Sequence, residues 1–466
     1  MSEPRYAPLS YGQKGLWLIQ QSVPTSFVYN VSFALRLHIS IEIGRWQEAA
    51  QLLVNRHAAL RTSFPVIDNT PMQKIAGYEP VSFTVIDGTA WSEEALLAAV
   101  QAEHERPFDI TAGPLFRMSL FTRTPVDHVL FVSAHHIAID GWSIHLLIEE
   151  LRLFYQALEQ GSAAPLPLVT ADYSEYVAWQ TALLQHEGEV HWAYWKEQLS
   201  GTLPLLQLPT DSVRPAVQSY RGVSQGFQLS ADLTARIKQA ARHYHCTLYV
   251  FLLAAYEVLL HRYSGQEDIL IGLTMAERHH PDFARVIGYF TSPVVARADF
   301  SSKPTFAQLL SQVRQQVFAA LEHQDYPFAL LVEKLNPKRD PSRPPIFQAN
   351  FVLQNFHHTQ LHADPAAADV AVESIPIVLA EGQLDLSLEM LEGPEGLEGY
   401  LKGSADLFAQ ATLARMVGHW ETLLHSIVAE PEQAVMRLPL LTAAERQKIL
   451  VEWNQNATPY AKDQCM

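Results

Sequence analysis

The sequence predicts an α/β fold built from two lobes of similar size. Amphipathic helical segments alternate with short apolar strands along the whole chain, without a fixed-period repeat, and proline clusters separate two such runs. The chain has 466 residues, of which 48% are hydrophobic and 18% charged, so it can bury a sizeable core. We therefore place one lobe at 1–175, a second at 176–438 and a linker at 439–466.

The first run contains a helix, a buried strand and a second helix. Apolar residues at helical spacing predict a helix within 45–64, a segment that ends in β-branched and aromatic residues. The nearly continuous apolar run at 127–136 predicts a buried strand. An amphipathic helix is expected at 143–158, capped by Asp140 or Ser143. Strand, short glycine-containing loop and helix therefore follow one another directly.

The second run follows the proline-rich segments 164–168 and 203–215. The apolar stretch at 248–260 predicts a buried helix that is too short to span a bilayer. Another buried strand is expected at 268–278. The tail at 441–466 predicts one short helix followed by polar residues, as in a linker between domains.

Composition argues against several classes of function. The formal net charge is −16, and such an acidic surface repels phosphate backbones and anionic lipids. We therefore expect neither nucleic acid nor membrane as a partner. The N-terminus lacks the basic and apolar regions of a signal peptide, and the two cysteines, Cys246 and Cys465, have no spacing typical of zinc sites. A cytoplasmic location is the simplest expectation.

The densest group of reactive side chains is AHHIAIDGWS at 134–143. His135 and His136 end the predicted strand, and Asp140 and Gly141 follow before the helix. Histidine, with an ordinary pKa of about 6.5, suits proton transfer at neutral pH. Gly141 allows close approach of the backbone to a ligand, and the helix start behind it offers N–H groups to a developing oxyanion.

Spacing alone leaves other interpretations of this segment open. Two adjacent histidines at a strand end fit buried core residues equally well. His136 and Asp140 suit a metal, but no third ligand follows at a recognisable spacing, so no metal site is predicted. The stretch 141–145 differs from a nucleophile elbow because His145 replaces the final glycine. The sequence also lacks GxxxxGK[ST], HExxH, and a GxGxxG after a strand.

HHIAIDG at 135–141 fits the HHxxxDG signature of the chloramphenicol-acetyltransferase-like superfamily, and the whole chain resembles a condensation domain of nonribosomal peptide synthetases. Six further stretches resemble the motifs of that family, in the family's order: 9–21, 56–64, 172–180, 287–297, 323–335 and 339–355. The resemblance implies two chloramphenicol-acetyltransferase-like lobes, each an α+β sandwich. It further implies that they form a V-shaped pseudo-dimer with a central tunnel.

The resemblance also implies a reaction. A donor acyl or peptidyl thioester on an upstream carrier protein would be joined to the amine of an aminoacyl thioester on a downstream carrier protein. Phosphopantetheine arms come with these donor and acceptor peptidyl carrier proteins, so no cofactor is expected to bind this chain directly. The tail resembles the connector toward a neighbouring adenylation domain, and the isolated domain is expected to be monomeric.

Roles for individual residues follow from the same resemblance. His136 is expected to hydrogen-bond the attacking amine, as general base or as positioner, while His135 shapes the loop. Asp140 is expected to be buried and paired with an arginine, for which Arg61 and Arg278 are the candidates. The backbone of Gly141 is expected to assist the oxyanion. The residues expected to line the substrate channel are Trp142, Ser143, Tyr289, Thr291 and Ser292.

Two positions depart from the family pattern: the first bears on substrate choice more than on catalysis, and the second is a mild change. The fifth motif often reads Phe-Val-Asn in the family but is Phe290-Thr291-Ser292 here, and Gly12 stands where alanine is common. RHAALRTSF and HHIAIDGWS resemble enzymes with an L-configured or achiral donor, and a starter-type acyl donor also remains open.

Related functions on the same scaffold leave different signatures. An epimerisation domain would carry an EGHGRE-like stretch, which is missing, and a heterocyclisation domain would have aspartates in place of His135 and His136. An ester-forming or stand-alone acyltransferase of the same fold is the enzymatic alternative. A non-catalytic docking platform for carriers or other partners is the alternative from a different class.

Overall fold

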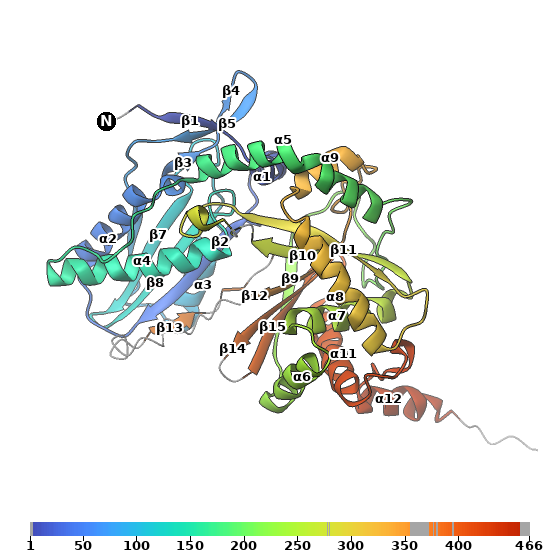
Figure 1. Ribbon diagram of the computed structural model, residues 1–466. Coiled ribbons are helices and arrows are strands. Elements are labelled where there is room, and N and C mark those ends of the chain that lie inside the picture. Colours follow the sequence, from blue (N-terminus) through green and yellow to red (C-terminus); the bar gives the residue numbers. More distant parts are fainter. Residues whose placement is uncertain are drawn as a thin grey trace, which may run out of the picture.

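The computed structural model describes residues 3–276, 278, 280–354, 372–375, 377–378, 381–393 and 396–456. Figure 1 shows two mixed α/β lobes, each built on its own sheet, which spread from a shared junction like the arms of a V. The long helix α5 (Tyr173–Gln198) runs from one lobe to the other across this junction. The predicted α/β class is confirmed.

A five-stranded sheet forms the centre of the N-terminal lobe, in the order β13-β2-β8-β7-β6. Strand β8 (Asp127–His135) lies in its middle and pairs antiparallel with β2 (Asn30–Leu37) and β7 (Phe116–Thr124). The edge strand β6 (Ser82–Asp87) pairs parallel with β7. Residues 128–135 are all buried, as the apolar run predicted, because a strand covered on both faces needs apolar side chains on both.

Helices cover both faces of this sheet. Alternate residues of β8 pack against α2 (Ile43–Arg56) and α4 (Gly141–Gln160), and the residues between them pack against α3 (Glu93–Glu105). The predicted helix within 45–64 therefore ends at Arg56. The remaining elements of this lobe are β1 (Arg5–Pro8), α1 (Tyr11–Ser22), the 3₁₀ turn η1 (Ala58–Arg61), β3 (Thr62–Ser63), β4 (Val66–Ile67) and β5 (Thr70–Ile75).

A six-stranded sheet forms the centre of the C-terminal lobe, in the order β11-β10-β12-β14-β15-β9. Its strands are β9 (Gly222–Gln228), β10 (Asp268–Ala276), β11 (Thr291–Asp299), β12 (Ala349–Gln354), β14 (Leu386–Gly393) and β15 (Gly396–Ser404). The helices and turns of this lobe are α6 (Ala231–His243), α7 (Leu248–Ser264), η2 (Pro281–Phe283), α8 (Phe306–Glu322), α9 (Phe328–Leu335), α11 (Gln410–Ala429), η3 (Val435–Arg437), α12 (Ala443–Leu450) and η4 (Glu452–Asn454).

Helix α7 is the buried helix that the sequence predicts, because every residue from Val250 to His261 is buried in the C-terminal core. Among the described residues, no single helix is both long and apolar enough to cross a membrane. The bent pair α6 and α7, at 104° to each other, passes that test only when the two are taken together.

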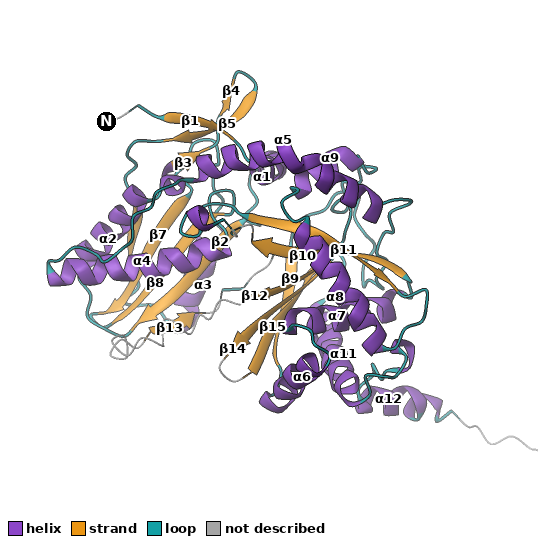
Figure 2. Cartoon of the chain, viewed as in Figure 1, coloured by secondary structure: helices purple, strands orange, loops and turns teal. Residues whose placement is uncertain are grey.

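The two faces of the C-terminal sheet differ. Leu388 of β14 and Leu401 of β15 point into the apolar core, toward α6, α7 and α11. Side chains alternate along a strand, so Glu389 and Lys402 lie on the opposite face. In Figure 2, the helices of the C-terminal lobe lie on the side of this sheet that is turned away from the N-terminal lobe, and the opposite face is turned toward that lobe. A polar sheet face therefore borders the lobe junction.

One strand from the C-terminal half of the chain joins the N-terminal sheet. Strand β13 (Val372–Ile375) pairs antiparallel with β2 and so completes the N-terminal sheet, although it follows most of the C-terminal strands in sequence. The boundary expected after residue 175 falls inside α5, and it stays a prediction. At the C-terminal end, α12 is the predicted short helix, and residues 457–466 of the expected linker lie outside the described residues.

Candidate active site

The loop between β8 and α4 carries the histidine motif. Strand β8 ends at His135, and α4 begins directly after Asp140, whose Oδ1 accepts a hydrogen bond from the backbone N–H of Ser143 at 2.8 Å. Every residue of 128–140 is buried except His136. The fold therefore presents one side chain of this loop to the surroundings.

The imidazole of His136 is oriented by one short hydrogen bond. Its Nδ1 lies 2.7 Å from the carbonyl oxygen of Ile139. A carbonyl can only accept, so Nδ1 carries the hydrogen and the neutral ring has its lone pair on Nε2. This Nε2 makes no hydrogen bond with any described residue. The ring of Tyr289 stands edge-on to the imidazole, with 5.1 Å between centroids. His136 thus has a free acceptor nitrogen at the lobe junction.

His135 points the other way, into the protein. It is 0% exposed, its Nε2 donates to Oε1 of Gln20 at 3.3 Å, and its Nδ1 accepts from the N–H of Ile137 at 3.1 Å. Burial, with a smaller contribution from the neighbouring His136, lowers the pKa of His135 to about 3. The ring therefore stays neutral near pH 7 and holds the loop in shape.

Asp140 joins the two lobes. Its side chain is 1% exposed, and its Oδ1 accepts a hydrogen bond from Arg278 at 3.0 Å, while Oδ2 accepts from the backbone N–H of Phe290 at 3.1 Å. The guanidinium of Arg278 also lies 4.0 Å above the centre of the Phe290 ring. A carboxylate of the N-terminal lobe is thus satisfied by the segment between β10 and β11 of the C-terminal lobe.

Arg61, the other candidate partner of Asp140, lies elsewhere, so that expectation is wrong. Its guanidinium donates to the carbonyl oxygen of Ala76. Burial and the nearby Arg5 lower the pKa of Arg61, and Asp172 opposes this effect. Arg61 lines a cavity of about 220 Å³ between η1 and the start of α5. Its hydrogen bond ties η1 to the residue after β5, and Asp140 is paired with Arg278 instead.

Ser143 is enclosed in the network around Asp140. It is 0% exposed, and its Oγ lies 2.7 Å from Oδ1 of Asp140 and 2.9 Å from Arg278. The expectation that Ser143 lines a substrate channel is therefore wrong, because its hydroxyl is engaged by the ion pair. Trp142 is partly exposed, and its indole N–H donates to the carbonyl oxygen of Ala284 at 3.0 Å, which gives a second link between the lobes.

Three further expected site residues lie around this junction. Gly141 is exposed as the first residue of α4, where the N–H groups of a helix have no intrahelical acceptor. Thr291 and Ser292 begin β11; Thr291 is partly exposed and Ser292 is 9% exposed. The expected roles of Gly141 at the oxyanion and of Thr291 and Ser292 in a substrate channel stay predictions.

The ring of Tyr289 owes its place beside His136 to a glycine. A Cβ on Gly12 would lie only 2.8 Å from Cε1 of Tyr289. The backbone of Tyr289 is held as well, since the hydroxyl of Tyr173 donates to its carbonyl oxygen at 2.5 Å. The departure from the family pattern at residue 12 therefore bears directly on the surroundings of His136.

Sequence reasoning missed a charged cluster on the C-terminal sheet. Nζ of Lys402 lies 3.0 Å from Glu389 and 3.2 Å from Glu381. Burial raises the pKa of Glu381, Lys402 and His136 lower it, and Glu389 raises it further. The alternation of apolar and polar residues at 386–389 and at 401–402 was a signal for a polar sheet face, but only the folded chain brings Glu381 to it.

Possible metal ligands and one of the two cysteines lie within the described part of the chain. No group of three or more His, Cys, Asp or Glu side chains there is placed to hold a metal ion. Cys246 is partly buried, and burial raises its thiol pKa to about 11. Cys465 lies outside the described residues.

Nearly the whole length of this chain resembles parts of known proteins. The family model described as condensation domain matches residues 4–450. One of the linear gramicidin synthase proteins of Brevibacillus parabrevis is 40% identical over 473 residues, which cover 99% of this chain and 9% of that protein. Tyrocidine synthase 3 of the same organism is 35% identical over 450 residues, which cover 96% of this chain and 7% of that protein. The chain thus spans less than a tenth of the length of either of these relatives.

Solved structures share the fold. A four-domain nonribosomal peptide synthetase bound to AMP and glycine has a TM-score of 0.86 and 26% identity, covering 96% of this chain and 35% of that chain. The X-domain from teicoplanin biosynthesis has a TM-score of 0.85 and 28% identity, covering 95% of this chain and 99% of that chain. These likenesses confirm the predicted two-lobed, chloramphenicol-acetyltransferase-like fold, and the central tunnel stays a prediction.

Proposed function

The chain belongs to the condensation-domain family, and from this membership we propose that it forms amide bonds between two carrier-bound substrates. The donor is an acyl or peptidyl thioester on an upstream carrier protein. The acceptor is the amine of an aminoacyl thioester on a downstream carrier protein. The lengthened chain then remains on the downstream carrier.

The orientation of His136 is the observation that carries this proposal. It is the one side chain of 128–140 that is not buried, and the bond from Nδ1 to Ile139 leaves Nε2 as a free acceptor. A nitrogen of this kind can accept a hydrogen bond from the N–H of an attacking amine. His135, by contrast, has both ring nitrogens engaged inside the protein.

The reaction needs no group from outside the two substrates. The amine nitrogen attacks the thioester carbonyl carbon, the C–S bond breaks, and the thiol leaves with the proton that the amine loses. The α-amine has a pKa of about 8, so a fraction is already neutral at pH 7. General-base help is worth about 10²–10⁴-fold, whereas alignment of the reactants supplies about 7–11 kcal/mol. We therefore assign His136 to positioning the amine more than to removing its proton.

The neighbouring groups support that alignment. Asp140 and Arg278 hold the loop of His136 against the C-terminal lobe and do not touch the substrate. The backbone N–H of Gly141 is proposed as a donor to the oxyanion that forms on the thioester carbonyl. Trp142, Tyr289, Thr291 and Ser292 remain the proposed neighbours of the substrates.

Partners and setting follow from the same proposal. Donor and acceptor carrier proteins and a neighbouring adenylation domain are the proposed partners. The phosphopantetheine arms arrive with the carriers as part of the substrates, so the chain itself needs no cofactor. The net charge of −16 disfavours nucleic acid and anionic lipid surfaces. We propose a cytoplasmic monomer, and a donor that is L-configured, achiral or a starter acyl group.

A condensation assay with separate carriers tests the function. A panel of loaded donor and acceptor carriers is mixed with the native protein, and the downstream carrier is weighed by intact-protein mass spectrometry. The expected product has the donor and acceptor masses together. His136→Ala should lower the rate about a hundredfold or more, and His186→Ala, at an exposed position on α5, should leave it unchanged. Half of the native activity in His136→Ala would overturn the assignment.

A docking platform is the second candidate, and one likeness favours it. The X-domain of teicoplanin biosynthesis, in its complex with OxyB, has a TM-score of 0.84 and 28% identity to this chain. If the chain is a docking platform, His136→Ala should bind the partner as tightly as the native protein does. Neither protein should then give a product with any carrier pair. Alcohol acceptors in the same assay identify the ester-forming alternative.

A further inference from the structure

The polar face of the C-terminal sheet holds two carboxylates and one ammonium group. Lys402, whose side chain is 7% exposed, lies between Glu389 at 3.0 Å and Glu381 at 3.2 Å. Nζ of Lys402 donates to Oε2 of Glu381, and no hydrogen bond to Oε1 of Glu381 is found among the described residues. The cluster therefore holds one positive and two negative groups when both carboxyls are ionised.

The backbone around Glu381 is tightly held. Glu381 forms an isolated β-bridge with Arg221, and the N–H of Gly382 donates to Tyr220 at 2.9 Å. A Cβ on Gly222 would lie 2.2 Å from the carbonyl oxygen of Glu381, so the backbone at Gly222 approaches that of Glu381 as closely as glycine allows. The place of the carboxylate is thus determined by its backbone.

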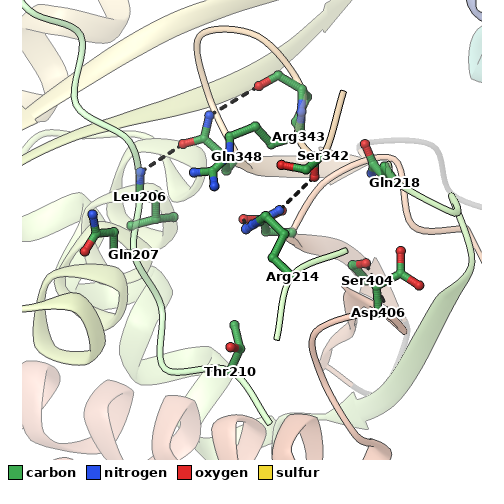
Figure 3. A network of polar contacts seen from close by, with 12 residues as sticks. Leu206, Gln207, Thr210, Arg214, Gln218, Ser342, Arg343, Gln348, Ser404 and Asp406 are labelled. Carbon is green, nitrogen blue, oxygen red and sulfur yellow. Dashed lines mark hydrogen bonds and ion pairs between the residues drawn. The ribbon is translucent and has the colours of Figure 1, made fainter. Parts of the chain in front are cut away.

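A second set of bonds secures the same segment a few residues on. The guanidinium of Arg214 pairs with Asp385. It also donates to the carbonyl oxygen of Ser342 at 3.0 Å, as Figure 3 shows. The side chain of Gln218 donates to the carbonyl oxygen of Gly382 at 2.6 Å. The segment 381–385 is therefore clamped from both ends.

Two hydrogen bonds bring this segment next to His136. The side chain of Gln383 donates to the carbonyl oxygen of Val28 at 2.9 Å. The backbone N–H of His136 donates to the carbonyl oxygen of Tyr29 at 2.7 Å. Gln383, two residues after Glu381, and His136 are therefore bonded to the adjacent residues Val28 and Tyr29 of the N-terminal lobe. The influence of His136 on the pKa of Glu381 agrees with this placement.

Among the described residues of the cluster, one ammonium group faces two carboxyl groups. A carboxylate removed from water needs a partner, and Lys402 is shared between Glu381, 12% exposed, and Glu389, 23% exposed. Burial raises the pKa of Glu381, and a second cation beside it would lower that pKa again. The reaction proposed above brings amines to His136, within the same junction.

We propose that Glu381 binds the α-ammonium group of a substrate opposite His136, with Lys402 and Glu389 holding its carboxylate in place. This inference rests on the proposed amide-forming function and names the residue that recognises the charged end of a substrate. The ammonium belongs either to the acceptor or to a donor with a free α-amine. The contact acts in binding, before the nitrogen attacks.

Turnover with matched substrates separates the two sources. Glu381→Gln keeps the size of the side chain and removes its charge. If the acceptor amine is bound, the variant raises the acceptor concentration for half-maximal rate about ten- to hundredfold with both free and N-acetylated aminoacyl donors. The same variant then treats an α-hydroxy acceptor as the native protein does. If the donor amine is bound, only reactions of free-amine donors slow.

Glu398→Gln is the matched control. Glu398 lies on the same face of β15, four residues or about 13 Å from Lys402, and should leave all rates unchanged. Equal rates for native protein and Glu381→Gln with every substrate pair would overturn the inference. The amide product of the native protein, lost in His136→Ala, would at the same time uphold the proposed function.

A binding experiment decides the question even if no product forms. Calorimetry compares glycyl-aminopantetheine with its hydroxyacetyl counterpart, which differ in ammonium against hydroxyl. The native protein should prefer the ammonium compound about tenfold or more, and Glu381→Gln, while still folded, should lose that preference. Equal binding of both compounds by the native protein would also overturn the inference.

Discussion

Asp140 and Arg278, which are 138 positions apart in the chain, form a buried ion pair across the two lobes. The N–O distance is 3.0 Å, and the side chains are 1% and 6% exposed. The same carboxylate caps the helix that follows the histidine loop. One residue therefore sets both the start of α4 and the contact of the His136 loop with the C-terminal lobe.

Asp140→Ala should lower the free energy of unfolding by about 3–5 kcal/mol, because it leaves the charge of Arg278 buried without a partner. Amide formation should fall as well, since the loop loses its contact with the C-terminal lobe. Denaturant unfolding of both proteins measures the first effect. Arg5→Ala is the control: its side chain is 53% exposed in its pair with Asp172, and such pairs contribute about 0–1 kcal/mol. Equal losses in the two variants would contradict the prediction.

The two adjacent histidines should respond oppositely to alanine. His135→Ala empties a buried volume and leaves the N–H of Ile137 without an acceptor, so we expect a loss of about 2–4 kcal/mol in stability. His136→Ala should change stability by less than about 1 kcal/mol, because the ring is partly exposed, while lowering the rate of amide formation about a hundredfold or more. Thermal melts and the carrier assay on both variants check this, and a larger stability loss in His136→Ala would refute it.

Gly12→Ala should disturb the site through Tyr289. The new methyl group would lie 2.8 Å from Cε1 of that ring, so the ring must move away from its place beside His136. We expect a cost of about 1–3 kcal/mol in stability and a slower reaction. The double variant Gly12→Ala/Tyr289→Leu should recover the stability, and failure to do so would argue against the steric cause. Gly44→Ala, with nothing within 4 Å of the new atom, is the control.

Glu257 should make stability depend on pH. It is 0% exposed in α7, neither carboxyl oxygen has a partner among the described residues, and burial raises its pKa to about 8. Between its ordinary value of 4.5 and pH 8, the unfolded chain releases a proton that the folded chain keeps. Stability should therefore fall as the pH rises through this range, by at most about 5 kcal/mol. Glu257→Gln should reduce that fall. Denaturant unfolding of the native protein and the variant at pH 5 and pH 8 checks this, and an equal loss of stability in both proteins between the two pH values would contradict it.

Local pattern was enough to predict much of the fold. The apolar runs at 127–136 and 248–260 became β8 and α7, since a segment buried on all sides needs apolar residues throughout. The short spacing from His136 to Asp140 likewise predicted a loop before a helix. Such features depend on neighbours within a few residues, so they can be recognised in the sequence itself.

Contacts between distant segments could not be predicted in this way. Two arginines suited Asp140, and the packing of the lobes chose Arg278 and left Arg61 against β5. The position of Ser143 in its motif suggested a channel residue, yet its hydroxyl is enclosed by groups from the other lobe. Periodicity carries no information on which partner a side chain meets across the junction.

The sequence by itself determined the α/β class, the helix and strand of the histidine loop, and the family. Those features rest on local periodicity and on spacings of a few residues. Only the tertiary structure decided that His136 is the one residue of 128–140 that is not buried, and that Glu381 and Lys402 lie near it. Their meeting depends on a β-bridge and a sheet register between distant segments of the C-terminal lobe, and on the hydrogen bond from Gln383 to Val28 of the N-terminal lobe.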